Sequence, residues 1–197
     1  MSMLTGLLGN ALGWDWTERD AHQSLQDRII LAAALVSEGE MLTDVQNVQL
    51  RATDRSWTTR GRSEGRAGAS YSAPHRRHRD FLTDAEVVVV LTLMPEEPSP
   101  TLDGIRAALM RPARPLFLGR KSCLPSAPLL GFSDGMDIIE ATDAYAALHR
   151  AVGAEGTCAC WPEGEGPGGM RTLDLADLRN WDSGLHGGTR QVHEGRL

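Results

Sequence analysis

The sequence predicts an α+β fold, and the patterns in its first half carry this prediction. Residues 3–12 place apolar side chains at helical spacing, and residues 28–50 show the aliphatic and alternating patterns of two strands joined by a turn. Residues 87–94 form an apolar, β-branched run, and a second amphipathic helix pattern follows at 101–110. Helices and strands therefore mix along one chain, as they do in α+β proteins.

The elements near the start of the chain have identifiable boundaries. Thr17 followed by Asp20 resembles a helix cap, so a short helix is expected from there to residue 29. The aliphatic stretch 28–36 then predicts a strand, and the imperfect alternation over 41–50 predicts a second strand after a turn.

The middle of the chain contains a long segment unlike the rest. Residues 51–80 have no sustained apolar period and contain several glycines, which indicates an extension away from the core. The run at 87–91 is apolar on both faces, which favours a central strand covered on either side. Thr101 is expected to cap the next helix, Pro112 to end it, and residues 116–118 to form a short strand.

This order corresponds to a ferredoxin-like β-α-β-β-α-β unit without its first strand, with the extension inserted before the central strand. The pattern weakens in the last third, where we expect a helix at 142–152, a glycine-rich turn at 163–169 and a polar tail. The predicted division is a ferredoxin-like domain at 1–118, which contains the extension at 51–80, and a small C-terminal region at 119–197.

Length and cysteine content limit the class of protein. A chain of 197 residues fills one principal fold. Three cysteines cannot all pair and no signal-peptide pattern precedes Gly6, so a reducing cytoplasm is the expected compartment. The apolar run at 87–94 is too short to cross a bilayer.

The distribution of charge points to a polyanionic partner although the formal net charge is −6. Residues 51–80 hold eight arginines against three acids, a local charge of +5, so the remaining residues carry −11. Codon bias explains why 19 of the 20 basic residues are arginine, but it does not explain why eight fall within thirty residues. Arginine binds phosphates through bidentate hydrogen bonds, so this segment predicts a phosphate-binding surface.

Two motifs resemble the CRISPR-associated Cas-five (CasD) family of the RAMP superfamily. Residues 2–13, SMLTGLLGNALG, resemble the family's Gly-Leu-Leu-Gly helix, and residues 111–123, RPARPLFLGRKSC, are similar to its Leu-Gly-Arg-basic-Ser-Cys signature. Between them lie a strand pair, an arginine-rich insertion that the family uses as a thumb, and the HRDFL lead at 78–82. The resemblance covers most of residues 2–123, and residues 178–181 and 193–196 also look like the type I-E branch.

The resemblance implies a ferredoxin-like (RRM-like) RAMP fold and a role in RNA binding. Family members begin with a strand before the Gly-Leu-Leu-Gly helix, whereas this sequence begins at the helix, so the first strand is expected to be missing. A start assigned to a downstream methionine, a truncated chain and a degenerate copy all account for this difference. The implied function is a non-catalytic subunit of a type I-E Cascade complex that holds the 5′ handle of the CRISPR guide RNA. The implied protein partners are the CasC backbone and the CasA large subunit.

The candidate RNA contacts follow from charge and from interleaved aromatic residues. Trp57 offers a stacking face to a base, or packs on the base of the extension, and Thr5 and Gly6 offer backbone amides to a phosphate, or simply pack. The predicted RNA-binding residues are Thr5, Gly6, Arg51, Arg55, Trp57, Arg60, Arg62, Arg66, Arg76, Arg77, Arg79, Arg111, Arg114, Arg120 and Lys121.

The main alternative is an endoribonuclease that processes guide precursors, as in the related type I-C branch. Tyr71, His75, His78 and Lys121 supply groups suited to acid-base cleavage, but no spacing among them specifies a catalytic site.

Two further alternatives are a metal site and a pure assembly protein that grips CasC. Cys158, Cys160, His149 and His186 lack the paired spacing of structural zinc motifs, so no metal or cofactor is expected.

Overall fold

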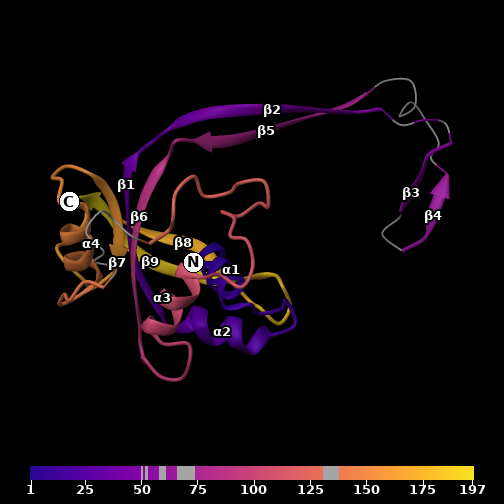
Figure 1. Ribbon diagram of the computed structural model, residues 1–197. Coiled ribbons are helices and arrows are strands. Elements are labelled where there is room, and N and C mark those ends of the chain that lie inside the picture. Colours follow the sequence, from indigo (N-terminus) through magenta and orange to yellow (C-terminus); the bar gives the residue numbers. More distant parts are fainter. Residues whose placement is uncertain (50, 52, 58–60, 66–73, 131–137) are drawn as a thin grey trace. The chain divides into compact units, whose positions relative to one another are not determined.

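The computed structural model describes residues 1–49, 51, 53–57, 61–65, 74–130 and 138–197 (Figure 1). The chain divides into two compact units. Unit 1 comprises residues 1–36 and 87–197, and unit 2 comprises residues 37–86. The mixture of helices with antiparallel sheets confirms the predicted α+β class.

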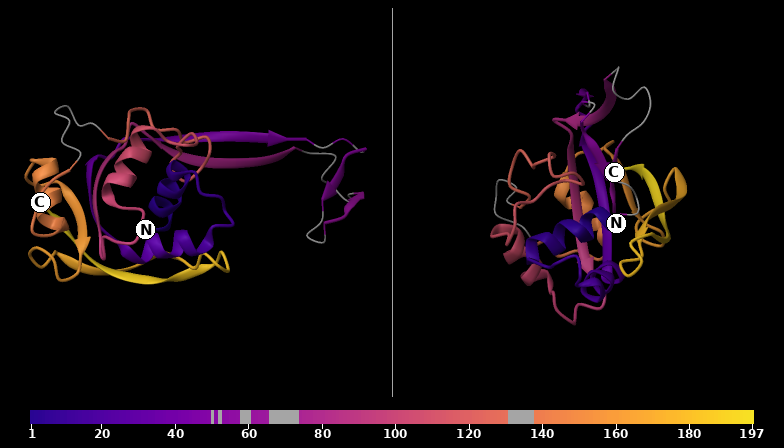
Figure 2. Two further views of the ribbon diagram at one scale, coloured as in Figure 1. Left: turned by 60° about the horizontal axis from the view of Figure 1, so that its bottom comes forward. Right: turned by 90° about the vertical axis from the view of Figure 1, so that its right-hand side faces the viewer.

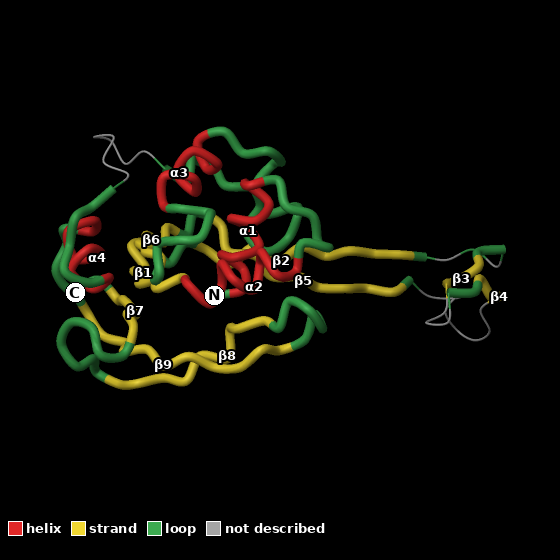
Figure 3. Tube along the Cα trace, turned by 90° about the horizontal axis from the view of Figure 1, so that it is seen from below, coloured by secondary structure: helices red, strands yellow, loops and turns green. Residues whose placement is uncertain are grey.

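Unit 1 is built on a five-stranded sheet with the strand order β6-β1-β7-β9-β8. Its strands are β1 (Ile29–Ser37), β6 (Glu86–Leu93), β7 (Cys158–Pro162), β8 (Arg171–Arg179) and β9 (His186–Arg196). β7 pairs antiparallel with both β1 and β9, and β8 runs antiparallel beside β9 (Figure 3). The last third of the chain therefore completes the sheet that β1 and β6 begin, and the prediction of a polar tail is wrong.

Four helices of the described residues pack on this sheet, and capping residues mark the ends of several of them. They are α1 (Ser2–Leu12), α2 (Arg19–Arg28), α3 (Leu102–Met110) and α4 (Ala144–Val152). The Thr101 hydroxyl accepts from the Gly104 amide at the start of α3, and Asp143 accepts from the Ala146 amide at the start of α4. All four predicted helices are confirmed. None of the helices in the described ranges is long and apolar enough to span a membrane.

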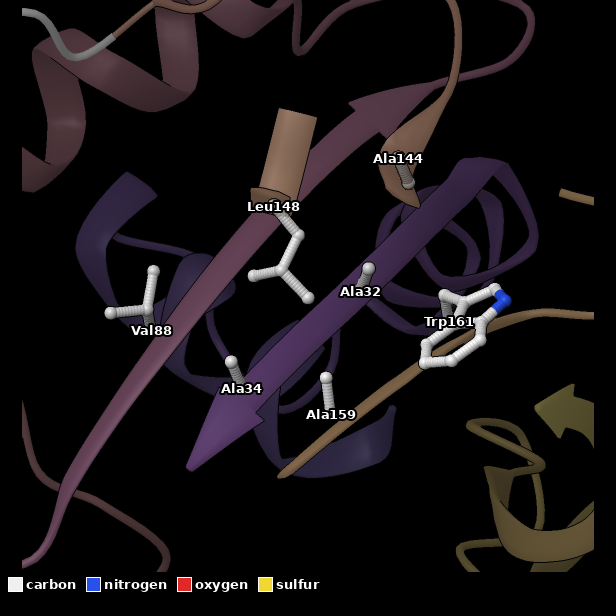
Figure 4. Close-up of a cluster of buried hydrophobic side chains, with 7 residues drawn as sticks. All are labelled: Ala32, Ala34, Val88, Ala144, Leu148, Ala159 and Trp161. Carbon is white, nitrogen blue, oxygen red and sulfur yellow. The ribbon is translucent and has the colours of Figure 1, made fainter. Parts of the chain in front are cut away.

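The first hydrophobic core lies between α4 and one face of the sheet (Figure 4). Leu148 of α4 points toward Val88 of β6 and Ala34 of β1, and Trp161 of β7 extends the cluster. The Trp161 indole nitrogen donates to the Pro167 carbonyl at 3.1 Å, so the buried ring keeps its polar group paired.

The second core lies on the opposite face, under α1, α2 and α3. It is formed by Leu7, Leu8, Leu25, Ile29, Leu93 and Ile105. Because successive strand residues point to opposite faces, Ile29 enters this core while Ala32 enters the first. Figure 2 shows α4 on one side of β1 and β6 and the other three helices on the other side.

Residues 90–93 are covered on both faces, as expected, but Val87 and Val89 are exposed, and β6 is the last strand in the order of the described sheet and not a central one. The apolar character of β6 comes from the two helical layers, because Val88 and Val90 face the first core and Leu91 and Leu93 the second.

The predicted strand at 116–118 is also wrong. The segment has no strand structure and runs along α1 instead, where the Ala113 amide donates to Ala11 and Asn10 donates to the Pro115 carbonyl. The prolines at 112 and 115 lack the amide donors that a sheet ladder needs.

Unit 2 contains two antiparallel strand pairs. β2 (Glu40–Val48) pairs with β5 (His75–Thr83), and β3 (Arg55–Trp57) pairs with β4 (Ser63–Gly65). Gly39 precedes β2 with a φ of +66°, and a Cβ there would lie 2.2 Å from the Thr83 carbonyl oxygen, so the position requires glycine. The sequence had predicted β2, but it had not predicted the strand structure of 75–83.

Candidate nucleic-acid interface

The predicted basic extension contributes one strand of the β2–β5 hairpin. The cross-strand pairs run from Glu40 with Thr83 to Val48 with His75, without a register shift. Side chains directly opposite each other share a face, and neighbours along a strand alternate between faces. The register therefore sorts every side chain of β5 onto one of two faces.

One face, here called the Arg77 face, carries alternate residues of both strands, and its members are His75, Arg77, Arg79, Phe81 and Thr83 of β5 with Val48, Gln46, Asp44, Leu42 and Glu40 of β2. The other, the Arg76 face, carries the remaining pairs, which are Arg76, His78, Asp80 and Leu82 of β5 with Asn47, Val45, Thr43 and Met41 of β2.

The three arginines of β5 are exposed and unpaired. Arg76, Arg77 and Arg79 have neither a hydrogen bond nor an ion pair through their side chains within the part of the chain that the structure describes. The nearby acids are engaged elsewhere, because Asp44 accepts from Gln46 and Asp80 accepts from Thr43, each at 2.7 Å. The guanidinium groups are therefore available to an external anion.

The remaining predicted residues of unit 2 are tied to local structure to different degrees. Arg55 donates to the Ser63 carbonyl at 2.9 Å, within the β3–β4 pair, and the Arg51 amide donates to Asp54 at 2.7 Å. Arg62 precedes β4 and makes a contact of its own. Arg60, Arg66 and Tyr71 lie outside the described residues, and Trp57 is described only as a backbone position of β3.

Thr5 and Gly6 have packing roles in unit 1. Thr5 is fully buried, and its amide donates to the Met1 carbonyl at 3.1 Å inside α1. A Cβ on Gly6 would lie 3.6 Å from the Trp181 ring, so this side of the helix faces protein. The alternative of simple packing accounts for both positions, and we leave them out of the proposed RNA interface.

The four basic residues of the second motif lie on the segment that follows α3. Arg111 ends the helix, and the Arg114 guanidinium donates to the Trp14 carbonyl. Arg120 and Lys121 are exposed in a turn closed by a hydrogen bond from the Leu118 amide to the Cys123 carbonyl at 2.7 Å. This stretch is a second basic surface, separate in the chain from the hairpin.

Comparison with known proteins now decides the family. The family model described as CRISPR-associated protein (Cas_Cas5) matches residues 1–193. The chain belongs to the CRISPR-associated Cas5 family. The resemblance inferred from residues 2–13 and 111–123 is thereby confirmed.

Solved structures share the fold of this Cas5 chain. One, described as a CRISPR RNA-guided surveillance complex, has a TM-score of 0.60 at 19% identity, and the match covers 100% of this chain and 77% of that one. Another, described as the crystal structure of a Cas protein, has a TM-score of 0.57 at 24% identity, with 100% and 79% covered. None of the curated proteins matches the chain.

The histidines that suggested a nuclease do not converge on the Cas5 hairpin. His75 pairs with Val48 on the Arg77 face, whereas His78 pairs with Val45 on the Arg76 face. An acid and a base that act on one phosphodiester must reach it together. Two histidines on opposite faces of a two-stranded ribbon do not meet this requirement within one hairpin.

The residues considered for a metal site do not form one. Among the described residues, no three His, Cys, Asp or Glu side chains are grouped closely enough to hold an ion. Burial, together with the nearby Glu194 carboxylate, raises the pKa of the Cys160 thiol, which disfavours the thiolate that would bind a metal.

The sequence alone did not identify Phe81 as a member of the Arg77 face. The signal was present, because His75, Arg77, Arg79 and Phe81 alternate with the residues between them at a period of two. The alternation is one of charged and aromatic residues rather than apolar ones, so a search for hydrophobic periodicity passed over it.

Proposed function

We propose that this Cas5 chain is a non-catalytic RNA-binding subunit of a Cascade-type CRISPR surveillance complex, of the type I-E branch, and that it holds the repeat-derived 5′ handle of the guide RNA. One structural relative is described as a CRISPR RNA-guided surveillance complex, which supports this setting. The CasC backbone and the CasA large subunit are the proposed protein neighbours.

The observation that carries the proposal is the set of exposed, unpaired arginines on β5. A guanidinium group loses little by leaving water for a phosphate, and its planar donors match two phosphate oxygens. Within the described residues, Arg76, Arg77 and Arg79 have no hydrogen bond or ion pair that an RNA would have to displace. The exposed basic residues after α3, in unit 1, are proposed as separate phosphate contacts.

The finer fold proposed is the ferredoxin-like RAMP arrangement. β1 and β6 are adjacent in the sheet, and α1 and α3 pack on the same core, which fits the two helices of that unit. β6 ends the strand order of the described sheet, and Val87 and Val89 are exposed on it. This edge is where the family's additional first strand would add.

The proposal that this chain does not cleave RNA rests on the positions of the two histidines of the hairpin. His75 and His78 lie on opposite faces of the hairpin, so cleavage would need groups from elsewhere. The proposal therefore expects that guide RNA incubated with the protein stays intact.

The test is RNA retention by the reconstituted complex, measured by filter binding with a guide that carries the 5′ handle. Replacing Arg76, Arg77 and Arg79 together by alanine should reduce the slope of log affinity against log salt by about 1.4 to 2, because each phosphate contact on a single strand contributes about 0.7 and two or three of these arginines make one. An unchanged slope with intact complex assembly would overturn the RNA-binding role and favour a scaffold, and specific scission of the RNA would overturn the non-catalytic role.

A further inference from the structure

The two faces of the β2–β5 hairpin differ in how their charges are arranged along β5. On the Arg77 face the β5 residues are His75, Arg77, Arg79 and Phe81, with no acid among them. On the Arg76 face Asp80 stands two residues from His78. Along β5 the cations of the Arg77 face therefore form a row without an acid, and the acids of this face, Asp44 and Glu40, lie on β2.

The spacing within the row suits an extended polyanion. Arg77 and Arg79 are two residues apart on one strand, a separation of about 6.6 Å, and both are exposed. Two long guanidinium side chains at this separation can bind neighbouring phosphates of a single strand. On the opposite face Arg76 has only His78 as its next basic neighbour along β5.

The residues opposite Arg77 and Arg79 on β2 indicate which of the two arginines attracts a phosphate more strongly. Arg77 lies opposite Gln46, which is neutral, and Arg79 lies opposite Asp44, whose carboxylate accepts from Gln46. The nearby negative charge weakens the attraction of Arg79 for a phosphate. Arg77 is therefore the stronger phosphate contact of the two.

Both faces carry exposed apolar side chains, and they differ in their aromatic content. The Arg76 face carries Met41, Val45 and Leu82, which are 67%, 52% and 65% exposed. The Arg77 face likewise carries Leu42 and Val48, each 54% exposed, and none of these five side chains offers RNA a charge or a stacking ring. The Arg77 face carries Phe81, an aromatic residue in line with the two arginines, and bases stack on aromatic rings in single-strand sites.

We infer that the hairpin binds guide RNA through the Arg77 face alone. Arg77 and Arg79 take neighbouring phosphates beside the half-buried Phe81, and the Arg76 face stays out of contact with RNA. This inference rests on the proposed function, because it assumes that single-stranded guide RNA is the ligand.

The test compares neighbouring charges on opposite faces. R76A and R77A each remove one exposed, unpaired arginine from adjacent positions of β5, so they change net charge equally. In the reconstituted complex, R77A should weaken binding of a handle-bearing guide RNA about tenfold and reduce the salt slope by about 0.7, whereas R76A should stay within about twofold of wild type. R79A should fall between them.

A charge-preserving variant separates contact from folding. R77K keeps the cation but loses the bidentate geometry, so it should restore the salt slope and only part of the affinity. A merely structural role for Arg77 would not give this split between slope and affinity. If R77K is no better than R77A in either respect, the phosphate contact is refuted.

The outcomes also separate this inference from the proposed function. Equal weakening by R76A and R77A would show that RNA binding stands and that the choice of face is wrong. Weakening by R76A alone would reverse the assignment of the faces. No change in any of R76A, R77A and R79A would remove the hairpin from the RNA interface and sink both proposals.

Discussion

Replacing Arg28 should destabilise unit 1 more than replacing any exposed arginine. Arg28 is the last residue of α2 and only 5% exposed. Its guanidinium donates to the carbonyls of Pro95 (2.9 Å), Pro100 (3.1 Å) and Glu96. The residue thereby holds the loop from β6 to α3 against the junction of α2 and β1.

The expected loss in the free energy of unfolding depends on the carbonyl groups that would lose their hydrogen-bond donor in R28M. Methionine has similar length but no donors, so three carbonyls lose their partner, at about 1–3 kcal/mol for each that stays buried. Pro95 and Glu96 are exposed residues whose carbonyls can turn to water, whereas Pro100 is buried.

Two other effects act in opposite directions. Methionine removes a favourable cation from the last turn of α2, and it also relieves the desolvation of a charge whose Nη1 atom is buried without a partner in the described structure. We expect a net loss of about 2–4 kcal/mol in the free energy of unfolding.

The assay is urea unfolding followed by circular dichroism, with R19M as the matched control. Arg19 lies in the same helix, and its ion pair with Asp182 is at the surface, so its loss should cost less than about 1 kcal/mol. R28K should fall between R28M and wild type, because lysine retains the charge with fewer directed donors. A free energy of unfolding for R28M within about 0.5 kcal/mol of wild type would show that desolvation offsets the three hydrogen bonds, and would refute the reasoning.

Two further predictions concern the sheet of unit 1. Burial alone would raise the pKa of Asp177, but hydrogen bonds from Arg190 and the Met1 amino group hold it below its ordinary value, so D177N should lose stability at neutral pH. Because the folded pKa is lowered, the difference in melting temperature from wild type should shrink as the pH falls below about 4, and a constant difference would contradict the charge-based explanation. On β6, V89K should leave the melting temperature nearly unchanged, whereas V88K should unfold the protein, because Val89 is 44% exposed and Val88 only 4%. Equal destabilisation by both would contradict the assignment of the faces of β6.

The elements that sequence predicted correctly are those with local signals. Thr101 caps α3 with its own hydroxyl, and α4 is followed by Gly153 in the left-handed conformation. These interactions join residues a few positions apart, so the sequence displays them directly. The clustering of arginines in 51–80 is likewise a property of the sequence alone.

The elements that the sequence did not predict are polar or charged strands whose stability depends on pairing with another strand. β8 and β9 are mostly polar and stabilise each other, and β5 is a charged strand held by β2, more than 30 residues away from it in several pairs. The face of the hairpin on which each arginine lies depends on that register. Thr5 shows a different limit of sequence-based prediction. The helical pattern correctly placed Thr5 in α1, but it did not reveal that the side chain is buried.

The separation of roles among the arginines explains how an acidic chain can present a basic surface. Arg28 and Arg190 are engaged by carbonyls or a carboxylate and serve the fold of unit 1. The arginines of β5 have no partner in the described structure, and the acids beside them are held by Gln46 and Thr43 instead. A net charge of −6 averages over both sets, but a phosphate approaching the hairpin interacts mainly with charges within about 10 Å. Because Arg77 makes no hydrogen bond or ion pair in the described structure, a loss of RNA binding in R77A that R77K partly restores can be attributed to the interface and not to the fold.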